Sequence, residues 1–180
     1  MKWADKLKQV NLREKPNDVF FTPAALAKEL IAAVPIEPGD SLLDPFAGAG
    51  VWFDNYPEGN PKEWAEVERG RDFWAIDDRV DWIITNPPFS KLTAILERSC
   101  YLSQKGFAYL LPLNALSFSR LEKISRYGFH IVKLQVFKNP KAWNIGFQMC
   151  FVVWSREPAA VPVIELQCED ITQAQLFSFS

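Results

Sequence analysis

The chain has 180 residues, of which 48% are hydrophobic, 14% aromatic and 23% charged, and its formal net charge is −2. This length suits one domain with one core, and the apolar content is too high for a disordered chain, so we expect residues 1–180 to form a single domain. The apolar stretches are far shorter than the roughly 20 residues of a membrane-spanning helix, and the first residues carry no secretory signal, which predicts a cytoplasmic protein without membrane contact.

Helices and strands alternate in the first half. Residues 1–18 are polar and are expected to form an N-terminal arm. The apolar spacing of residues 23–34 predicts a helix that begins at Pro23 with Thr22 as its N-cap. Residues 51–56 leave room for only a short helix before a Pro- and Gly-rich turn. Buried strands are predicted at residues 41–43, 64–67 and 81–85.

The second half continues this alternation. Helices are predicted at residues 91–103, where Gly106 would close the helix, and at 119–127. Strands are predicted at residues 107–112, 129–137 and 147–154, the last two as an antiparallel hairpin, and residues 155–180 are expected to form a C-terminal tail. This order predicts an α/β fold in which a mostly parallel sheet of about seven strands has helices on both faces.

One strand end carries a turn of small residues. Asp44 follows the strand at 41–43 and opens the segment Pro45-Phe46-Ala47-Gly48-Ala49-Gly50. In an open α/β sheet, ligands bind beyond the carboxyl ends of the strands, and glycines let the backbone approach a ligand closely. The segment is a candidate ligand-binding loop, although by itself such a segment is more often a plain turn.

A second strand end carries Asn86-Pro87-Pro88-Phe89. Two prolines cannot donate backbone hydrogen bonds, and each restricts the residue before it, so the Asn86 side chain and the neighbouring carbonyls are held rigidly. That rigidity suits the presentation of two hydrogen-bond acceptors to one amino group, with Phe89 as a flat apolar surface beside them. The alternative is an ordinary proline-terminated strand with a core phenylalanine.

Together and in this order, these segments resemble the S-adenosylmethionine-dependent amino-methyltransferases, particularly the adenine-N6 DNA methyltransferases. The family's catalytic tetrapeptide is matched by residues 86–89, its cofactor loop by residues 44–50 and its aromatic-Thr-Pro element by residues 21–23. The resemblance extends from about residue 18 to residue 154, implies a Rossmann-like methyltransferase domain, and includes the small phage-encoded form of these enzymes. Too few residues follow Trp154 for a separate target-recognition domain.

The resemblance also implies residue roles. The implied cofactor-binding residues are Phe21, Thr22, Asp44, Pro45, Phe46, Ala47, Gly48, Gly50, Glu66, Asp72, Phe73 and Asn86. Glu66 would bind the ribose hydroxyls, with Glu68 as the alternative, and Asp72 would face the adenine amine. The implied catalytic residues are Asn86, Pro87, Pro88 and Phe89. Asn86 Oδ1 and the Pro87 carbonyl would align the target amine, and Phe89 would stack on the flipped base.

Charge is distributed unevenly along the sequence. The segment from Arg120 to Lys141 contains six basic residues and one acidic residue, Glu122. A local positive surplus can steer a polyanion to one face of an acidic protein, although a solvated surface would have the same composition. Nucleic-acid contacts are predicted at Arg120, Lys123, Lys138, Lys141 and Trp143.

The expected activity is methyl transfer from S-adenosylmethionine to the N6 amine of adenine in DNA, without a metal. Methylation of RNA adenine or of a protein glutamine remains open, as does a cofactor-binding, non-catalytic subunit of a methyltransferase complex. The expected partners are DNA or RNA and either a specificity subunit or a second copy of the chain, in the cytoplasm of a bacterium or of a phage-infected host.

Overall fold

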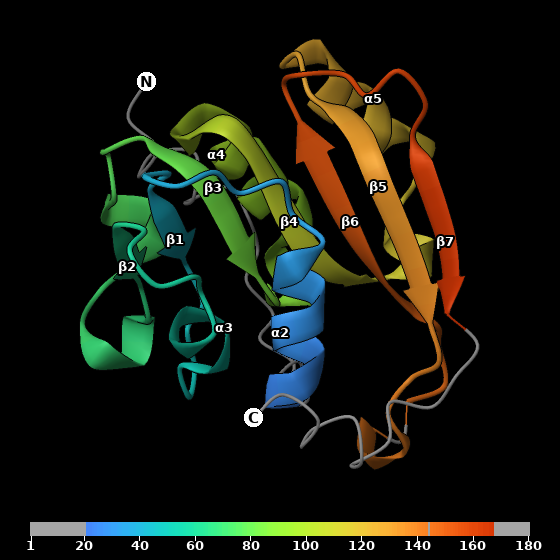
Figure 1. Cartoon of the computed structure of the whole chain (residues 1–180), viewed down its shortest axis with the longest axis horizontal. Coiled ribbons are helices and arrows are strands. Elements are labelled where there is room, and N and C mark those ends of the chain that lie inside the picture. The colour runs from blue at the N-terminus through green and yellow to red at the C-terminus, as the bar shows by residue number, and fades with distance from the viewer. Residues whose placement is uncertain (1–20, 144, 168–180) are drawn as a thin grey trace.

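The computed structural model describes residues 21–143 and 145–167 (Figure 1). Its strands are β1 (Leu42–Asp44), β2 (Lys62–Trp64), β3 (Val80–Thr85), β4 (Ser103–Pro112), β5 (His130–Phe137), β6 (Met149–Ser155) and β7 (Val163–Gln167). Its α-helices are α2 (Ala24–Ala32), α3 (Val51–Asp54), α4 (Leu92–Leu102) and α5 (Phe118–Arg126). Five short 3-10 helices lie in the described loops: η1 (Val67–Arg69), η2 (Phe73–Ala75), η3 (Phe89–Lys91), η4 (Leu113–Ala115) and η5 (Lys141–Trp143).

The seven strands form one sheet in the order β2-β1-β3-β4-β6-β5-β7. Strand β6 runs antiparallel to both of its neighbours, and every other pair is parallel. The carboxyl ends of β1, β3, β4 and β5 therefore lie along one edge of the sheet, together with the start of β6. The predicted α/β class, the mostly parallel sheet and the antiparallel hairpin are confirmed.

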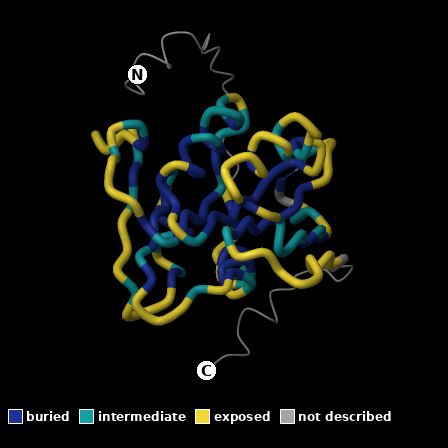
Figure 2. Tube along the Cα trace, turned by 90° about the horizontal axis from the view of Figure 1, so that it is seen from above, coloured by how far each residue is buried: buried dark blue, intermediate teal, exposed yellow. Residues whose placement is uncertain are grey.

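Alternate residues of the strands face opposite helical layers. Leu42 and Trp82 belong to the cluster that α2 and α3 cover, whereas Leu43 and Ile83 belong to the cluster beneath α4 and α5. This alternation follows from the period of two in a strand, and both layers are apolar because the sheet is covered on both sides. Helix α2 lies in front of the sheet in Figure 1, and Figure 2 shows buried segments at the centre of the molecule with exposed segments around them.

The predicted closure of a helix by Gly106 is wrong. Helix α4 ends at Leu102, and Gly106 lies within β4. A Cβ atom at Gly106 would lie 2.3 Å from the backbone oxygen of Trp154 and 2.3 Å from the ring of Trp82. The glycine is required because the strand passes an indole ring and a neighbouring backbone at this point, and not because a helix ends there.

Two terminal predictions also change. Pro23, not Thr22, is the N-cap of α2, and no side chain caps this helix. The Thr22 hydroxyl accepts a hydrogen bond from Trp52. The predicted tail at 155–180 contains β7, which pairs in parallel with β5. The predicted arm at residues 1–18 and the end of the tail, residues 168–180, lie outside the described residues. In the described part of the chain, no helix is long and apolar enough to cross a bilayer.

Candidate active site

A cavity of about 430 Å³ opens at the carboxyl edge of β1 and β3. It is lined by Phe21, Thr22, Pro45, Phe46, Ala47, Gly48, Ala49, Val51, Trp52, Glu66, Val67, Asp72, Phe73, Trp74, Asn86, Pro88, Lys91 and Ile95. All the predicted cofactor-binding residues are in this set except Asp44 and Gly50. We call this space the site cavity.

The loop after β1 brings backbone to the cavity wall. Gly48 and Gly50 have φ angles of 49° and 93°, which residues with a Cβ rarely adopt. The Gly50 N–H donates to the Ala47 carbonyl at 2.6 Å, which closes the turn directly before α3. Gly50 is therefore buried within the turn and shapes the loop, while Gly48 is exposed and lines the cavity.

Glu66 joins this loop to the segment after β2. Its Oε2 accepts a hydrogen bond from the Gly48 backbone N–H at 2.8 Å, and its Oε1 accepts one from the Glu68 N–H at 3.4 Å. The Arg69 guanidinium donates to the Gly48 carbonyl from the same segment. Glu66 is half-buried and lines the cavity, whereas Glu68 is exposed and does not. Of the two predicted alternatives, only Glu66 has a carboxylate at the cavity.

Asp44 lies behind the loop with no exposed surface. Its Oδ1 accepts hydrogen bonds from the Thr85 hydroxyl at 2.7 Å and from the Phe46 N–H at 3.3 Å, whereas its Oδ2 is buried and accepts none from the described residues. Burial disfavours the charged form and raises the pKa of Asp44 to about 7, against the opposing effect of the Thr85 and Phe46 hydrogen bonds. This carboxyl group is consequently suited to an additional donor or cation.

Two tryptophans fix the segment before α2 against the cavity. Trp52 Nε1 donates to Thr22 Oγ1 at 3.3 Å, and Trp143 Nε1 donates to the Phe21 carbonyl at 2.9 Å. Because Thr22 accepts the first of these bonds, its own hydroxyl proton can still be donated to a ligand. Trp143 is 8% exposed and packs against Phe137, so the structure places it in the core and not on the surface where the sequence predicted it.

The segment after β2 supplies the next wall. Phe73 is buried edge-on against Phe46, with ring centroids 5.3 Å apart. Asp72 is exposed, and its Oδ1 accepts a hydrogen bond from the Trp74 N–H at 3.0 Å. An aromatic ring and a carboxylate thus line the cavity from consecutive residues, an arrangement that fits an aromatic heterocycle with an amino group.

The tetrapeptide at the end of β3 faces the cavity with two of its residues. Asn86 and Pro88 line the cavity, and Pro87 is buried. Phe89 is half-buried and packs against both core clusters, and it does not line the cavity. The structure therefore brings Asn86 and Pro88 into one cavity with Glu66 and Asp72, whereas Phe89 packs against the core.

Several lining residues were not predicted. Lys91 and Ile95 line the cavity from η3 and α4. They follow the tetrapeptide and are four residues apart, which places them on one face of a helix and could have identified them. Trp52 and Trp74 line the cavity beside Val51 and Phe73, so their closeness in sequence to the predicted loop and to Phe73 could have identified them.

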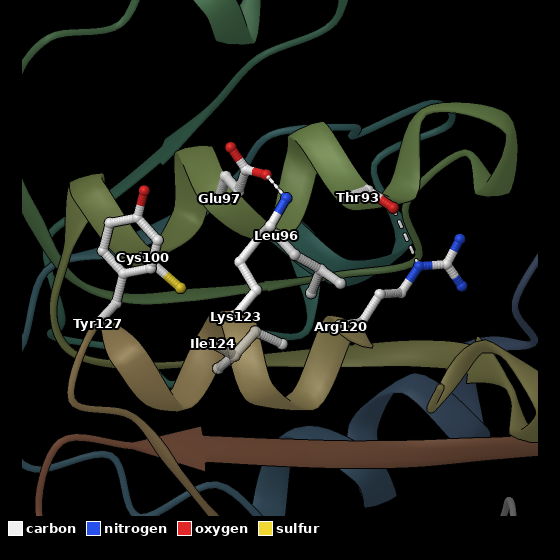
Figure 3. Close-up of a pocket in the computed structure, with 8 residues that line it drawn as sticks. All are labelled: Thr93, Leu96, Glu97, Cys100, Arg120, Lys123, Ile124 and Tyr127. Atoms are coloured by element: carbon white, nitrogen blue, oxygen red, sulfur yellow. Dashed lines mark hydrogen bonds and ion pairs between the residues drawn. The ribbon is translucent and has the colours of Figure 1, made fainter. Parts of the chain in front are cut away.

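The predicted basic residues separate into two groups. Arg120 Nε donates to Thr93 Oγ1 at 3.0 Å, and Lys123 pairs with Glu97, so both side chains reach from α5 to α4 (Figure 3). Lys138 and Lys141 are exposed on the segment after β5, at the same edge of the sheet as Asn86. Arg120 also lies close to the cavity wall, because its partner Thr93 lies between the lining residues Lys91 and Ile95.

No protein-family model and no curated protein sequence matches the chain. Solved structures do match. A Listeria monocytogenes protein assigned to the class I S-adenosylmethionine-dependent methyltransferases aligns with a TM-score of 0.64 at 12% identity, over 96% of this chain and 72% of that chain. The chain has the class I methyltransferase fold.

Two further structures carry this fold with different assignments. The methyltransferase subunit of a Streptococcus thermophilus type I restriction-modification system aligns with a TM-score of 0.61 at 15% identity, over 82% of this chain and 47% of that chain. A Pyrococcus horikoshii protein assigned as an RNA methyltransferase aligns with a TM-score of 0.59 at 18% identity, over 85% of this chain and 95% of that chain. The chain thus spans about half of the type I subunit but nearly all of the archaeal protein.

Proposed function

We propose that this chain transfers a methyl group from S-adenosylmethionine to the N6 amine of adenine in DNA. The observation that carries the proposal is the shared cavity. Asn86 and Pro88 of an Asn-Pro-Pro-Phe tetrapeptide line the same space as the glycine loop, Glu66 and Asp72. The class I methyltransferase fold supports the cofactor, and the tetrapeptide supports a planar amino group as the methyl acceptor.

The residues at the cavity fit this cofactor. Asp44 lies behind the loop and does not line the cavity, but its buried Oδ2 accepts no hydrogen bond from the described residues and would accept one from a cationic ammonium group that reaches it past the loop. Glu66 offers carboxylate oxygens to the ribose hydroxyls, and Thr22 offers a hydroxyl proton to a carboxylate. When bound, the cofactor supplies an electrophilic methyl group on a sulfonium.

Asn86 and Pro87 supply the chemistry of the acceptor. The lone pair of an adenine amine is delocalised into the ring, so the amine attacks poorly. Hydrogen bonds from its two N–H groups to Asn86 Oδ1 and the Pro87 carbonyl make the nitrogen more tetrahedral and orient its lone pair. No strong general base is needed at Asn86, because the proton leaves after the nitrogen has become cationic.

The choice of DNA over other substrates rests on the tetrapeptide resemblance. RNA adenine remains the second candidate, because the chain covers 95% of the archaeal protein assigned as an RNA methyltransferase. A protein glutamine amide also presents a planar amino group. Recognition of a DNA sequence would come from a specificity subunit or a second copy of the chain, and the matched Streptococcus thermophilus protein is itself a subunit of a type I system.

The test is transfer of labelled methyl groups to DNA, RNA and glutamine peptides. Asn86→Ala should lower turnover on adenine DNA by a factor of about 100 or more and leave cofactor affinity unchanged, because Asn86 acts chiefly in the transition state. Asn114→Ala, at an exposed asparagine on η4, is the matched control and should keep wild-type turnover. Label at cytosine, or a wild-type rate in Asn86→Ala, would overturn the proposal, and the purine analogue without an amine should accept no label.

A further inference from the structure

Exposed phenylalanines gather at one edge of the sheet. In the described part of the chain, the exposed phenylalanines are Phe21, Phe118 and Phe147, with 69%, 81% and 37% of their surfaces accessible. Phe21 precedes α2, Phe118 begins α5, and Phe147 precedes β6. Each of these positions lies at the edge where β1, β3 and β4 end. Leu113, directly after β4, adds another exposed apolar side chain, at 37%.

Backbone and side-chain contacts connect this apolar edge to the site cavity. Phe21 itself lines the cavity. The Leu113 N–H donates to the Gln148 carbonyl at 2.8 Å, so Leu113 lies beside the residue that follows Phe147. The hydrogen bond of Arg120 to Thr93 fixes the start of α5, and hence Phe118, beside the start of α4, directly after Lys91 of the cavity wall. We call Phe118 and Phe147 the aromatic rim, and the aliphatic Leu113 lies at the same edge.

Few cations accompany the aromatic rim. Arg120 and Lys123 are engaged with α4, Arg69 donates to the Gly48 carbonyl, and Arg71 pairs with Glu63. The other described cations of this edge are Lys91, Lys138 and Lys141. The chain as a whole carries a net charge of −2. Binding of a duplex depends on the neutralisation of many phosphates, whereas an unpaired strand is held by aromatic side chains that stack on successive bases together with a few cations.

We propose that the aromatic rim binds the substrate as an unpaired nucleic-acid strand, with bases next to the target stacked on Phe118 and Phe147. This inference rests on the proposed function and narrows its substrate. A base in an unpaired strand reaches Asn86 without the loss of its pairing partner, which a duplex would have to give up. Stacking also tolerates any sequence, because every base has a face that can stack.

The experiment measures fluorescence anisotropy of a labelled adenine-containing oligonucleotide, single-stranded and as its duplex, with wild-type protein and three variants. Phe118→Ala should weaken single-strand binding by about tenfold, the order expected for the loss of one stacked base. Phe118→Tyr should restore it, because the phenol ring stacks as well. Tyr127→Ala removes an aromatic residue that is 41% exposed, directly after the last residue of α5, and is the matched control.

The inference is supported if the single strand binds at least tenfold more tightly than the duplex and only Phe118→Ala weakens it. Equal or tighter duplex binding, no binding of either form, or unchanged affinity in Phe118→Ala would overturn it. These outcomes are distinct from failure of the proposed function. A protein that binds single strands through Phe118 and transfers no methyl group contradicts the activity alone, and one that methylates only duplex DNA contradicts the unpaired substrate alone.

Discussion

The carboxylate of Glu66 accepts a hydrogen bond from the backbone N–H of Gly48, with 2.8 Å between Oε2 and N. The two residues belong to loops that follow neighbouring parallel strands, β1 and β2. One acidic side chain therefore fixes the glycine loop and also presents oxygen atoms to the site cavity. A ligand diol at this place would add its hydrogen bonds to a carboxylate that is already oriented.

Replacement of Glu66 tests this arrangement. Glu66→Ala should weaken binding of S-adenosylmethionine by about 1.5–3 kcal/mol, the range for a hydrogen bond to a charged group, as measured by titration calorimetry. Glu68→Ala is the matched control, because Glu68 lies two residues away and is exposed outside the cavity. Equal losses in both variants, or wild-type affinity in Glu66→Ala, would contradict the assignment of the ribose-binding carboxylate to Glu66.

Asp44 should make both ligand binding and stability depend on pH. Its pKa in the folded protein is raised from 3.8 to about 7. Its contribution to stability is therefore fully present below pH 3.8 and is lost as the pH rises towards 7 and above, because the unfolded chain releases this proton more readily. An ammonium group favours the ionised carboxylate, so cofactor affinity should increase as the pH rises through 7.

Asp44→Asn separates these effects from those of other groups. Between pH 4 and pH 8, the unfolding free energy of the wild type should fall relative to that of Asp44→Asn by at most about 4 kcal/mol, measured by urea denaturation. The variant should bind the cofactor weakly, without the increase in affinity near pH 7. Asp54→Asn, at an exposed position, is the control. Parallel stability profiles for wild type and Asp44→Asn would show that Asp44 titrates normally.

The sequence predicted those features that depend on neighbouring residues. The strand ends at Asp44 and Asn86 were identifiable because a buried apolar run leads directly into glycines or prolines there, and the structure places Asn86 in the cavity and Asp44 behind it. Their catalytic and binding roles stay predictions.

Features that depend on distant contacts were not predictable. Trp143 was predicted to contact nucleic acid because it lies in a basic segment, but its indole N–H bonds to the Phe21 carbonyl, 122 residues away. Gly106 looked like a helix end, whereas its requirement comes from Trp82 and Trp154. The strand β7 follows the Pro- and Ala-rich residues 158–162, and among the described strands it pairs with β5 alone, at the edge of the sheet.

Gly106 offers a direct test of the packing. Gly106→Ala should lower the unfolding free energy by about 3 kcal/mol or more, at the upper end for overpacking, because the added methyl group meets a backbone oxygen and a buried ring. Gly146→Ala is the control, since a Cβ there would meet no atom within 4 Å. Urea denaturation of the two variants measures the difference. Similar stabilities would mean that β4 and β6 can separate to admit a methyl group.

The two groups of basic residues should respond differently to salt. Lys141 is exposed on the segment whose Trp143 bonds to Phe21 of the cavity. Lys141→Ala should therefore make the negative slope of log affinity against log salt shallower by about 0.7 on single strands. Lys123 is paired with Glu97 on α4, and the side chains are 48% and 15% exposed. Lys123→Ala should therefore leave the slope unchanged and lower the unfolding free energy by at most about 1 kcal/mol, as for other partly exposed ion pairs. Salt titrations of oligonucleotide binding compare the two variants directly. If Lys123→Ala changes the slope and Lys141→Ala does not, the nucleic acid lies along α5 and not across the site cavity.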